Sequence, residues 1–404
     1  MENLTAVILA GGKGTRLGNI TKNTPKPLLK INNKKFMDYL IFNIARFGFK
    51  KIIIVAGFKG SQFEIYRNKK ILNTKIELFI EKKINGTLGA LDKIKKKIKS
   101  NFFIFNGDTF FNFNYLDLIT LSQKNKKKEV YLSLRKIICK DLERYTAYKF
   151  KNNQLLLEKK KINKKILISG GIIYCKRTIL NNLGRYGDLE EHFNNHKQLK
   201  TKIIGKVYNK EFIDIGLPKD FFSSKSFLKK NLPKKAIFLD RDGVLNKINK
   251  GQYIINKNQF KWIPGAKKTI KFFNDRNYYV FIITNQSGIG RGLIKIKDYF
   301  KIEEKIQNEL LQIGAHVDKI YFCPYHEEAK IQKYRKKSFY RKPNPGMILK
   351  ALKEFPVVKK GSFFIGDNLT DKIASDKSKI KFLMFRDKNL FNFVKKKLRI
   401  VSQY

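Results

Sequence analysis

Two carboxylates, Asp240 and Asp242, stand two positions apart directly after an apolar run at residues 236–239. In a loop that follows a strand, side chains at this spacing can converge on one metal ion and one phosphoryl group. Like charges so close together are costly unless a cation compensates them, and this cost itself favours Mg²⁺ at the pair. The two aspartates therefore predict phosphoryl chemistry at a divalent metal.

A second candidate site lies near the start of the chain, where a glycine loop follows an apolar run. Glycines let backbone N–H groups come close to a triphosphate, and Arg16 and Lys26 add cationic donors for phosphoryl charge. The loop is no dinucleotide fingerprint, because Leu17 stands where glycine is needed, and no P-loop, because Gly14 follows Lys13. The loop residues expected at the phosphates are Gly11, Gly12, Gly14 and Thr15.

The loop and the Pro25-Lys26-Pro27 segment resemble the signature of the sugar-1-phosphate nucleotidyltransferases, over most of residues 1–225. In that family two aspartates bind Mg²⁺, which implies this role for Asp108 and Asp214. A Glu-Lys pair contacts the sugar hydroxyls and the sugar phosphate, which implies Glu158 and Lys159. The segments that fit the sugar and base loops are Gly170-Gly171 and Gly86–Ala90.

The resemblance implies an in-line displacement. A phosphate oxygen of a sugar 1-phosphate attacks the α-phosphorus of a nucleoside triphosphate and releases pyrophosphate. Such a reaction needs positioning and charge neutralisation more than covalent chemistry from the protein. Arg16, Lys26 and Lys159 would hold the phosphates. For Lys159, which lies in a run of three lysines, the alternative is a solvated surface residue.

The order of motifs from Asp240 onward resembles the phosphatases of the haloacid dehalogenase superfamily. The resemblance implies that Asp240 is the nucleophile, which forms an aspartyl-phosphate, and that Asp242 is the general acid and base. Mg²⁺ would be held by Asp240, by Asp367 and by the backbone carbonyl of Asp242. Asp371 either orients this shell or caps the helix that follows. The side chains implied to bind the phosphoryl group and the substrate are Thr284, Asn285, Arg341 and Lys342.

Finer features resemble the heptose 1,7-bisphosphate phosphatases and the related histidinol-phosphate phosphatases, in segments 285–292, 323–326 and 341–347. The short interval between Asp242 and Thr284 leaves little room for a cap domain. We therefore expect an open site suited to a phosphosugar, where Arg341 either contacts a second phosphate or lies at the surface.

One departure from that family concerns its structural zinc, which Cys-x-His and a later Cys-x-Cys often hold. Here Cys323 is followed two positions on by Tyr325, and the later pair reads Ser338 and Tyr340. One thiolate with at most His326 cannot complete a tetrahedral site. We therefore expect Mg²⁺ in both halves and no zinc.

Together the resemblances imply consecutive chemistry. The second half would remove the C7 phosphate of D-glycero-D-manno-heptose 1,7-bisphosphate, and the first half would join the resulting heptose 1-phosphate to a nucleotide. GTP is the favoured nucleotide by resemblance, while ATP, CTP and UTP stay open. The alternatives are a nucleotidyltransferase for mannose or glucose 1-phosphate fused to a histidinol-phosphate-like phosphatase, a degenerate half with a binding role, and a nucleic-acid binder. The sequence does not indicate which oligomeric state the protein adopts.

Composition bounds the protein class. Lys and Arg number 87 against 33 Asp and Glu, which gives a formal net charge of +54. The lysines are spread over the whole chain without any zinc-finger, basic-region or RNA-binding motif, so we expect phosphorylated small molecules and no nucleic acid as partners. A hydrophobic fraction of 42% excludes a disordered chain. With no membrane-length apolar run, no export signal and only three cysteines, we expect a cytoplasmic enzyme without a membrane partner.

The elements that must position these residues alternate between short apolar runs and longer amphipathic stretches, which indicates an α/β protein with parallel sheets and crossover helices. A second series of strands starts at residue 236, after a polar stretch broken by Pro233. We expect two Rossmann-like three-layer domains in tandem, a nucleotidyltransferase fold at 1–225 and a haloacid dehalogenase-like fold without a large cap at 236–404, with a linker at 226–235. The expected strands are 6–10, 51–56, 102–105, 130–134, 171–174, 236–239, 279–283, 319–322 and 362–365.

Overall fold

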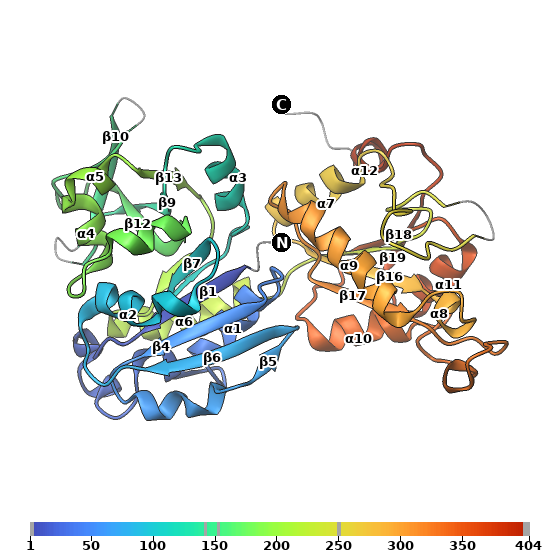
Figure 1. The fold of residues 1–404 in the computed structure, drawn as a ribbon, viewed down its shortest axis with the longest axis horizontal. Helices are drawn as coiled ribbons and strands as arrows, with labels where there is room; N and C mark the ends of the chain where they lie inside the picture. Colours follow the sequence, from blue (N-terminus) through green and yellow to red (C-terminus); the bar gives the residue numbers. More distant parts are fainter. Residues whose placement is uncertain (1–3, 141–143, 152–153, 249–251, 399–404) are drawn as a thin grey trace. The chain divides into compact units, whose positions relative to one another are not determined.

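The computed structural model describes residues 4–140, 144–151, 154–248 and 252–398. The chain divides into two compact units, Met1–Asn231 and Leu232–Tyr404 (Figure 1). Each unit is an α/β structure with its own sheet and its own buried core, and each is described by itself below.

Unit 1 is built on a 10-stranded sheet that centres on β1 (Thr5–Ala10). Aliphatic side chains dominate β1 and are buried on both faces, apart from the half-buried Leu9, as suits a central parallel strand. It pairs in parallel with β4 (Lys51–Ala56) on one side and β7 (Phe102–Asn106) on the other. The main path of the sheet is β11-β10-β12-β7-β1-β4-β6-β5, and β9 joins β12 to β13.

The other elements of unit 1 surround this centre. The remaining strands of the large sheet are β5 (Lys70–Ile71), β6 (Thr74–Ile80), β9 (Val130–Ile138), β10 (Ala147–Lys151), β11 (Gln154–Leu157), β12 (Lys165–Cys175) and β13 (Ile203–Val207). Two small antiparallel pairs are β2 (Lys30–Ile31) with β3 (Lys34–Lys35), and β8 (Thr109–Phe111) with β14 (Phe212–Asp214). The α-helices are α1 (Phe36–Ala45), α2 (Gly86–Ile94), α3 (Asp117–Lys124), α4 (Leu189–Asn195), α5 (Lys197–Lys200) and α6 (Pro218–Asn231). The short 3-10 helices are η1 (Thr15–Thr21), η2 (Lys26–Leu28), η3 (Gly60–Tyr66), η4 (Lys95–Lys97) and η5 (Arg177–Asn182).

Unit 2 holds a five-stranded, fully parallel sheet in the order β17-β16-β15-β18-β19. Its strands are β15 (Ala236–Leu239), β16 (Tyr279–Asn285), β17 (Lys319–Cys323), β18 (Phe363–Gly366) and β19 (Lys381–Met384). Helices flank it in Figure 1: α7 (Ala266–Asp275), α8 (Ser287–Gly290), α9 (Ile296–Leu311), α10 (Gly346–Glu354), α11 (Leu369–Lys377) and α12 (Leu390–Lys397), with η6 (Gln332–Tyr334) in a loop. The longest, α9, buries Tyr299, Ile302, Ile306 and Leu310 on one face, at helical spacing.

In each unit the first strand lies inside the sheet, and later strands of the chain pair with it on both sides. β1 lies between β4 and β7, and β15 lies between β16 and β18. The carboxyl end of such a strand is a topological switch point, where open α/β sheets bind their ligands. The glycine loop follows β1 and Asp240 follows β15, so both candidate sites occupy these positions.

Every expected strand lies within an observed strand or differs from it by one residue at its start, but two expectations were wrong. The sheet of unit 1 is mixed, because β12 runs antiparallel to β7, β9 and β10. The start of the predicted linker is helical, since α6 runs to Asn231 and the units divide after it. Its lysines and serines suggested a loop, yet α6 buries Ser224 and Leu228, and Phe227 packs edge-on against Phe110.

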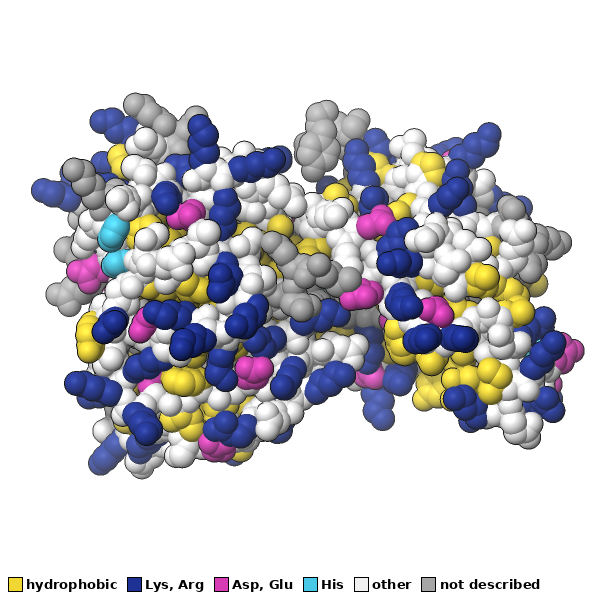
Figure 2. Space-filling view, viewed as in Figure 1, with side chains coloured by type: hydrophobic (Ala, Val, Ile, Leu, Met, Phe, Trp, Pro, Cys, Tyr) yellow, Lys and Arg dark blue, Asp and Glu magenta, His cyan; other side chains and the backbone are white. Residues whose placement is uncertain are grey.

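The surface charge is dispersed. Figure 2 shows Lys and Arg side chains scattered over the visible face of each unit, interrupted by apolar and acidic side chains, rather than gathered in one stripe. Among the residues that the structure describes, no helix has the length and apolar character to cross a membrane.

Two candidate active sites

The glycine loop of unit 1 opens onto a cavity of about 780 Å³ at the carboxyl end of β1. Gly11, Gly12, Gly14 and Arg16 line it. Gly14 has a φ of 72°, in the left-handed region, and stands directly before η1, so a side chain there would strain the turn. Thr15, which the sequence placed in this site, lies outside the lining that the described residues form. The loop thus presents backbone to the cavity, as phosphate binding requires.

Lys26, Asp108 and Asp214 meet on the floor of this cavity. Lys26 Nζ lies 2.8 Å from Asp108 Oδ2, and the lysine is 8% exposed. Asp214 reaches Asp108 through the pairing of β14 with β8, in which Ile215 N–H donates to the Asp108 carbonyl at 3.0 Å. Burial, reinforced by the Asp108 carboxylate, raises the pKa of Asp214 to about 6. The negative charge of two neighbouring carboxylates is unfavourable unless a cation compensates it. The pair therefore suits Mg²⁺ as a ligand set.

Sequence reasoning missed Arg144, which also lines the cavity. Its Nη2 lies 2.6 Å from Asp220 Oδ2 and 3.8 Å from Asp214 Oδ2, and it donates to the Asp214 carbonyl at 3.1 Å. The Arg144 guanidinium therefore fixes the position of Asp214. No motif marked it, because Arg144 lies outside the helices and strands, and its partners Asp214 and Asp220 are 70 or more positions away in the sequence.

Neighbouring lysines of the run at 159–161 differ in whether they line the cavity. Glu158 and Lys160 line the cavity, whereas Lys159 is exposed and outside the lining formed by the described residues. Successive side chains of an extended chain point to opposite sides, so Glu158 and Lys160 share one face. Another acid was missed: Glu190, whose pKa is raised by burial, accepts from Tyr148 Oη at 3.2 Å and lines the same cavity.

In unit 2 Asp240 is 8% exposed and paired with Lys342, whose Nζ lies 2.8 Å from Asp240 Oδ1. The same Nζ lies 2.6 Å from Asp371 Oδ1 and donates to the Ile283 carbonyl at 3.0 Å. Burial, opposed by Lys342 and reinforced by Asp371, raises the pKa of Asp240 to about 8. Asp371 also caps α11, where it accepts from Asn368 N–H at 3.2 Å. The capping role expected for Asp371 is confirmed, and its role at a metal stays a prediction.

The donor set in unit 2 fits a divalent metal. Oxygens of Asp240, Asp367 and Asp371 lie within 4.8 Å of one another. Gly243, at a φ of 89°, makes this approach possible, because a Cβ there would collide with the Asp367 carboxyl. Hard carboxylate oxygens are the ligands that Mg²⁺ prefers.

The remaining side chains implied for unit 2 differ in what they do. Thr284, 1% exposed, accepts from Gln286 Nε2 at 2.9 Å and keeps its own proton to donate. Asn285 uses its amide on the backbone of Lys342, at 3.0 and 3.1 Å, so it positions that lysine. Arg341 is half-buried and donates to the Tyr325 carbonyl at 3.3 Å, and burial, together with Arg291, lowers its pKa.

The loop expected to lack zinc is closed by other contacts. His326 N–H donates to the Tyr334 carbonyl at 3.1 Å, and Arg335 Nε donates to the Ala329 carbonyl at 2.7 Å. Cys323 is buried and its thiol has a raised pKa because of that burial. The absence of zinc stays a prediction.

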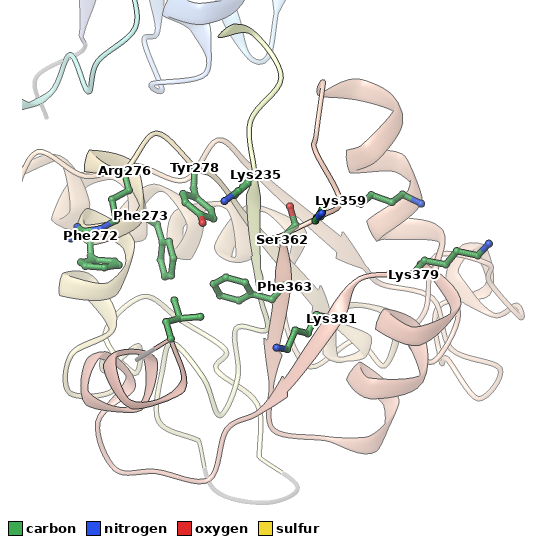
Figure 3. A pocket seen from close by; sticks show the side chains of 13 residues that line it. Lys235, Phe272, Phe273, Arg276, Tyr278, Lys359, Ser362, Phe363, Lys379 and Lys381 are labelled. Atoms are coloured by element: carbon green, nitrogen blue, oxygen red, sulfur yellow. The ribbon is translucent and has the colours of Figure 1, made fainter. Parts of the chain in front are cut away.

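A separate cavity of about 650 Å³ lies at the opposite edge of the unit 2 sheet, before the strands rather than after them (Figure 3). Helices α7 and α11 end there, and carbonyl groups at helix C-termini attract cations, which accounts for Arg276 and Lys379 without a ligand. We assign it no function. Its basic lining residues are Lys235, Arg276, Lys359, Lys360, Lys379 and Lys381.

Beneath the second site, the Glu303 carboxyl is buried beside Tyr299 and Arg241, and burial raises its pKa to about 7. The folded state then binds a proton that the unfolded state releases near pH 4.5, so stability falls as pH rises from there to about 7. We expect Glu303→Gln to raise the melting temperature by several degrees at pH 8 and by little at pH 5. Thermal unfolding at both pH values checks this, with the neighbouring Glu304→Gln as control. Equal shifts at both pH values would contradict it.

Comparison with known proteins separates the two units. Residues 5–231 match the family described as nucleotidyl transferase, and residues 235–389 match the family described as polynucleotide kinase 3 phosphatase. The chain is 39% identical over 165 residues to a D-glycero-β-D-manno-heptose-1,7-bisphosphate 7-phosphatase of Rhodopseudomonas palustris, which covers 41% of this chain and 91% of the relative.

Two further similarities concern unit 1. The chain is 33% identical over 228 residues to a D-glycero-α-D-manno-heptose 1-phosphate guanylyltransferase of Campylobacter jejuni, covering 54% of this chain and 97% of the relative. Among solved structures, HddC from Yersinia pseudotuberculosis complexed with GMP-PN is 26% identical with a TM-score of 0.46, covering 55% of this chain and 98% of that one.

Proposed function

We propose a two-step function for a chain that belongs to the nucleotidyl transferase family over residues 5–231 and, in its second unit, to the heptose bisphosphate phosphatases of the haloacid dehalogenase superfamily. It is a bifunctional enzyme of heptose phosphate metabolism. Unit 2 removes the C7 phosphate of D-glycero-D-manno-heptose 1,7-bisphosphate, and unit 1 transfers a nucleotidyl group to the heptose 1-phosphate. The observation that carries this is the presence of a complete set of phosphoryl-transfer side chains at each switch point.

In unit 2 Asp240 is the nucleophile. Its carboxylate oxygen bonds to the phosphorus while the bond to the sugar oxygen breaks, and the Asp242 carboxyl gives that oxygen a proton. Water then attacks the aspartyl-phosphate, Asp242 takes its proton, and phosphate leaves. Lys342 and Thr284 bind the phosphoryl oxygens. Asp240, Asp367 and the Asp242 carbonyl would hold Mg²⁺, which would supply charge neutralisation.

In unit 1 the protein contributes positioning. The glycine loop and Arg16 hold the triphosphate, and Lys26 neutralises the α-phosphate as the sugar phosphate oxygen attacks. Lys160, rather than Lys159, takes the sugar phosphate, because it shares the cavity face with Glu158. Mg²⁺, held by Asp108 and Asp214, would offset charge on the phosphates.

GTP is the nucleotide that the cavity suits best. Glu81 lines the cavity beneath the glycine loop, and a Cβ on Gly11 would lie 2.9 Å from its Oε2. Lys93 Nζ holds the other oxygen, Oε1, at 3.0 Å, and the carboxylate is 1% exposed. A carboxylate only accepts hydrogen bonds, and guanine alone offers it two adjacent donors, N1–H and the exocyclic amine. The name of the Campylobacter relative agrees with this reading.

A coupled assay tests the whole proposal. Purified protein receives the α or the β anomer of D-glycero-D-manno-heptose 1,7-bisphosphate, Mg²⁺ and each nucleoside triphosphate in turn, and phosphate and pyrophosphate are measured. We expect phosphate release without nucleotide, followed by pyrophosphate release only with GTP. An oligonucleotide 3′-phosphate and histidinol phosphate serve as competing substrates. Phosphate release from these but not from heptose bisphosphate would overturn the assignment of unit 2.

Changing the carboxylate tests the base preference separately. We expect Glu81→Gln to lower kcat/KM for GTP by about 10- to 100-fold, because an amide opposes one of the two guanine donors with a donor of its own. Its kcat/KM for UTP should fall little or rise. Glu77→Gln, on β6 and 24% exposed outside this cavity, is the matched control. Unchanged GTP selectivity in the Glu81 variant would contradict the guanine assignment.

A further inference from the structure

The Asp242 carboxylate is enclosed by donors from three side chains of unit 2. Arg241 Nη2 lies 2.9 Å from Oδ2 and Arg241 Nε lies 3.1 Å from Oδ1. Asn246 Nδ2 donates to Oδ1 at 3.0 Å, and Gln286 Nε2 donates to Oδ2 at 2.8 Å. Both oxygens of Asp242 therefore accept hydrogen bonds, and these bonds fix the orientation of the carboxyl group. We refer to Arg241, Asn246 and Gln286 as the Asp242 clamp.

The clamp residues are inside the protein. Arg241 is 2% exposed, Asn246 0% and Gln286 4%. The Arg241 guanidinium lies over the Tyr299 ring, 5.8 Å from its centroid. Burying three polar side chains costs stability, and hydrogen bonds offset part of that cost. Here Arg241 pairs with Gln286, and all three side chains donate to the Asp242 carboxylate. A merely solvated aspartate would need none of them.

The Gln286 amide has one favourable orientation. Its Oε1 accepts from Arg241 Nη2 at 3.1 Å while its Nε2 faces the carboxylate. A flipped amide would set an acceptor against the carboxylate and a donor against the guanidinium. In this orientation Nε2 also donates to Thr284 Oγ1 at 2.9 Å. One amide group thus links Asp242 to a side chain that binds the phosphoryl oxygens.

We propose that Gln286 and Asn246 are positioning residues that hold Asp242 in line with the leaving sugar oxygen, with Gln286 tying that alignment to the phosphoryl contact at Thr284. The inference rests on the proposed phosphatase function of unit 2. As the phosphorus–oxygen bond to the sugar breaks, its electron pair stays on the sugar oxygen, which takes the Asp242 proton. A misdirected carboxyl leaves that oxygen as a costly alkoxide.

The test uses leaving groups that differ in their need for a proton. The variants are Gln286→Met, which keeps the length but removes the amide, and Asn246→Ala, which removes the donor on the opposite side. For each, kcat/KM is measured with heptose 1,7-bisphosphate and with p-nitrophenyl phosphate. kcat/KM reports the steps through departure of the leaving group, and nitrophenolate departs without protonation.

We expect kcat/KM for heptose bisphosphate to fall by about 10²-fold in both variants, and that for p-nitrophenyl phosphate to fall by less than about fivefold. Gln332→Met, at an exposed position, is the matched control and should change neither value. Equal losses on both substrates would overturn the proposal, because a structural or phosphate-binding role predicts them, and so would no loss on either. Wild-type protein that cleaves neither substrate would overturn the phosphatase function itself.

Discussion

Asp240→Asn should abolish phosphate release, by at least about 10⁴-fold in kcat, and leave nucleotidyl transfer to authentic heptose 1-phosphate intact. An amide nitrogen or oxygen at this position cannot form the aspartyl-phosphate. The change keeps the shape of the side chain, and Lys342 keeps its partner Asp371 at 2.6 Å, so the fold should survive. Phosphate release from the bisphosphate and pyrophosphate release from heptose 1-phosphate with GTP are measured on the same preparation.

The control for that variant is Asp376→Asn, an exposed aspartate of α11 that pairs only with Lys372 among the ion pairs of the described residues. It should leave both activities unchanged. Loss of both activities in Asp240→Asn would argue against two independent sites, and retained phosphate release would remove Asp240 from the role of nucleophile.

The second large effect concerns unit 1. Lys26→Ala should lower kcat for nucleotidyl transfer by about 10²- to 10³-fold, while phosphate release by unit 2 stays unchanged. The ammonium group lies 2.8 Å from Asp108, and it partly opposes the rise that burial causes in the pKa of Asp214. Its loss removes charge neutralisation where phosphoryl charge develops and removes the ion-pair partner of Asp108.

The measurement is pyrophosphate release from GTP and heptose 1-phosphate at saturating substrate, which separates kcat from KM. Lys22→Ala is the control, because Lys22 is exposed, follows η1 directly and lies outside the cavity lining formed by the described residues. Pyrophosphate release at the wild-type rate in Lys26→Ala would remove Lys26 from the site. A rise in KM alone would limit its role to binding.

Local sequence was sufficient to locate a candidate site where reactive residues directly follow a strand. Asp240 and Asp242 after β15, and the glycine loop after β1, are marked by an apolar run followed at once by charged or flexible residues. The resemblance to the haloacid dehalogenase phosphatases implied that Thr284 and Asp367 lie near Asp240, and both follow or end strands of the same parallel sheet. Alternation of strands and helices was enough to predict the fold class and the two-unit organisation.

Residue-level errors came where a pattern admits two geometries. The sequence of the lysine run 159–161 does not reveal which member faces the cavity, and in the structure Lys160 lines it while Lys159 is exposed. The Lys- and Ser-rich stretch before residue 232 suggested a linker, yet most of it is α6, because its few apolar positions find buried partners. The antiparallel course of β12 was invisible for the same reason, since pairing direction depends on distant strands.

Sequence by itself determined the two phosphoryl-transfer chemistries and their order along the chain, and it proposed candidate residues for them, because these candidates lie in short recognisable motifs. Only the tertiary structure decided how those residues are held. Arg144 on Asp214, Glu81 beneath the glycine loop, and the clamp of Arg241, Asn246 and Gln286 around Asp242 pair groups that a linear reading does not connect. Burial and charge pairing depend on neighbours in three dimensions, so the orientation and proton affinity of these groups follow from the tertiary structure and not from the linear sequence.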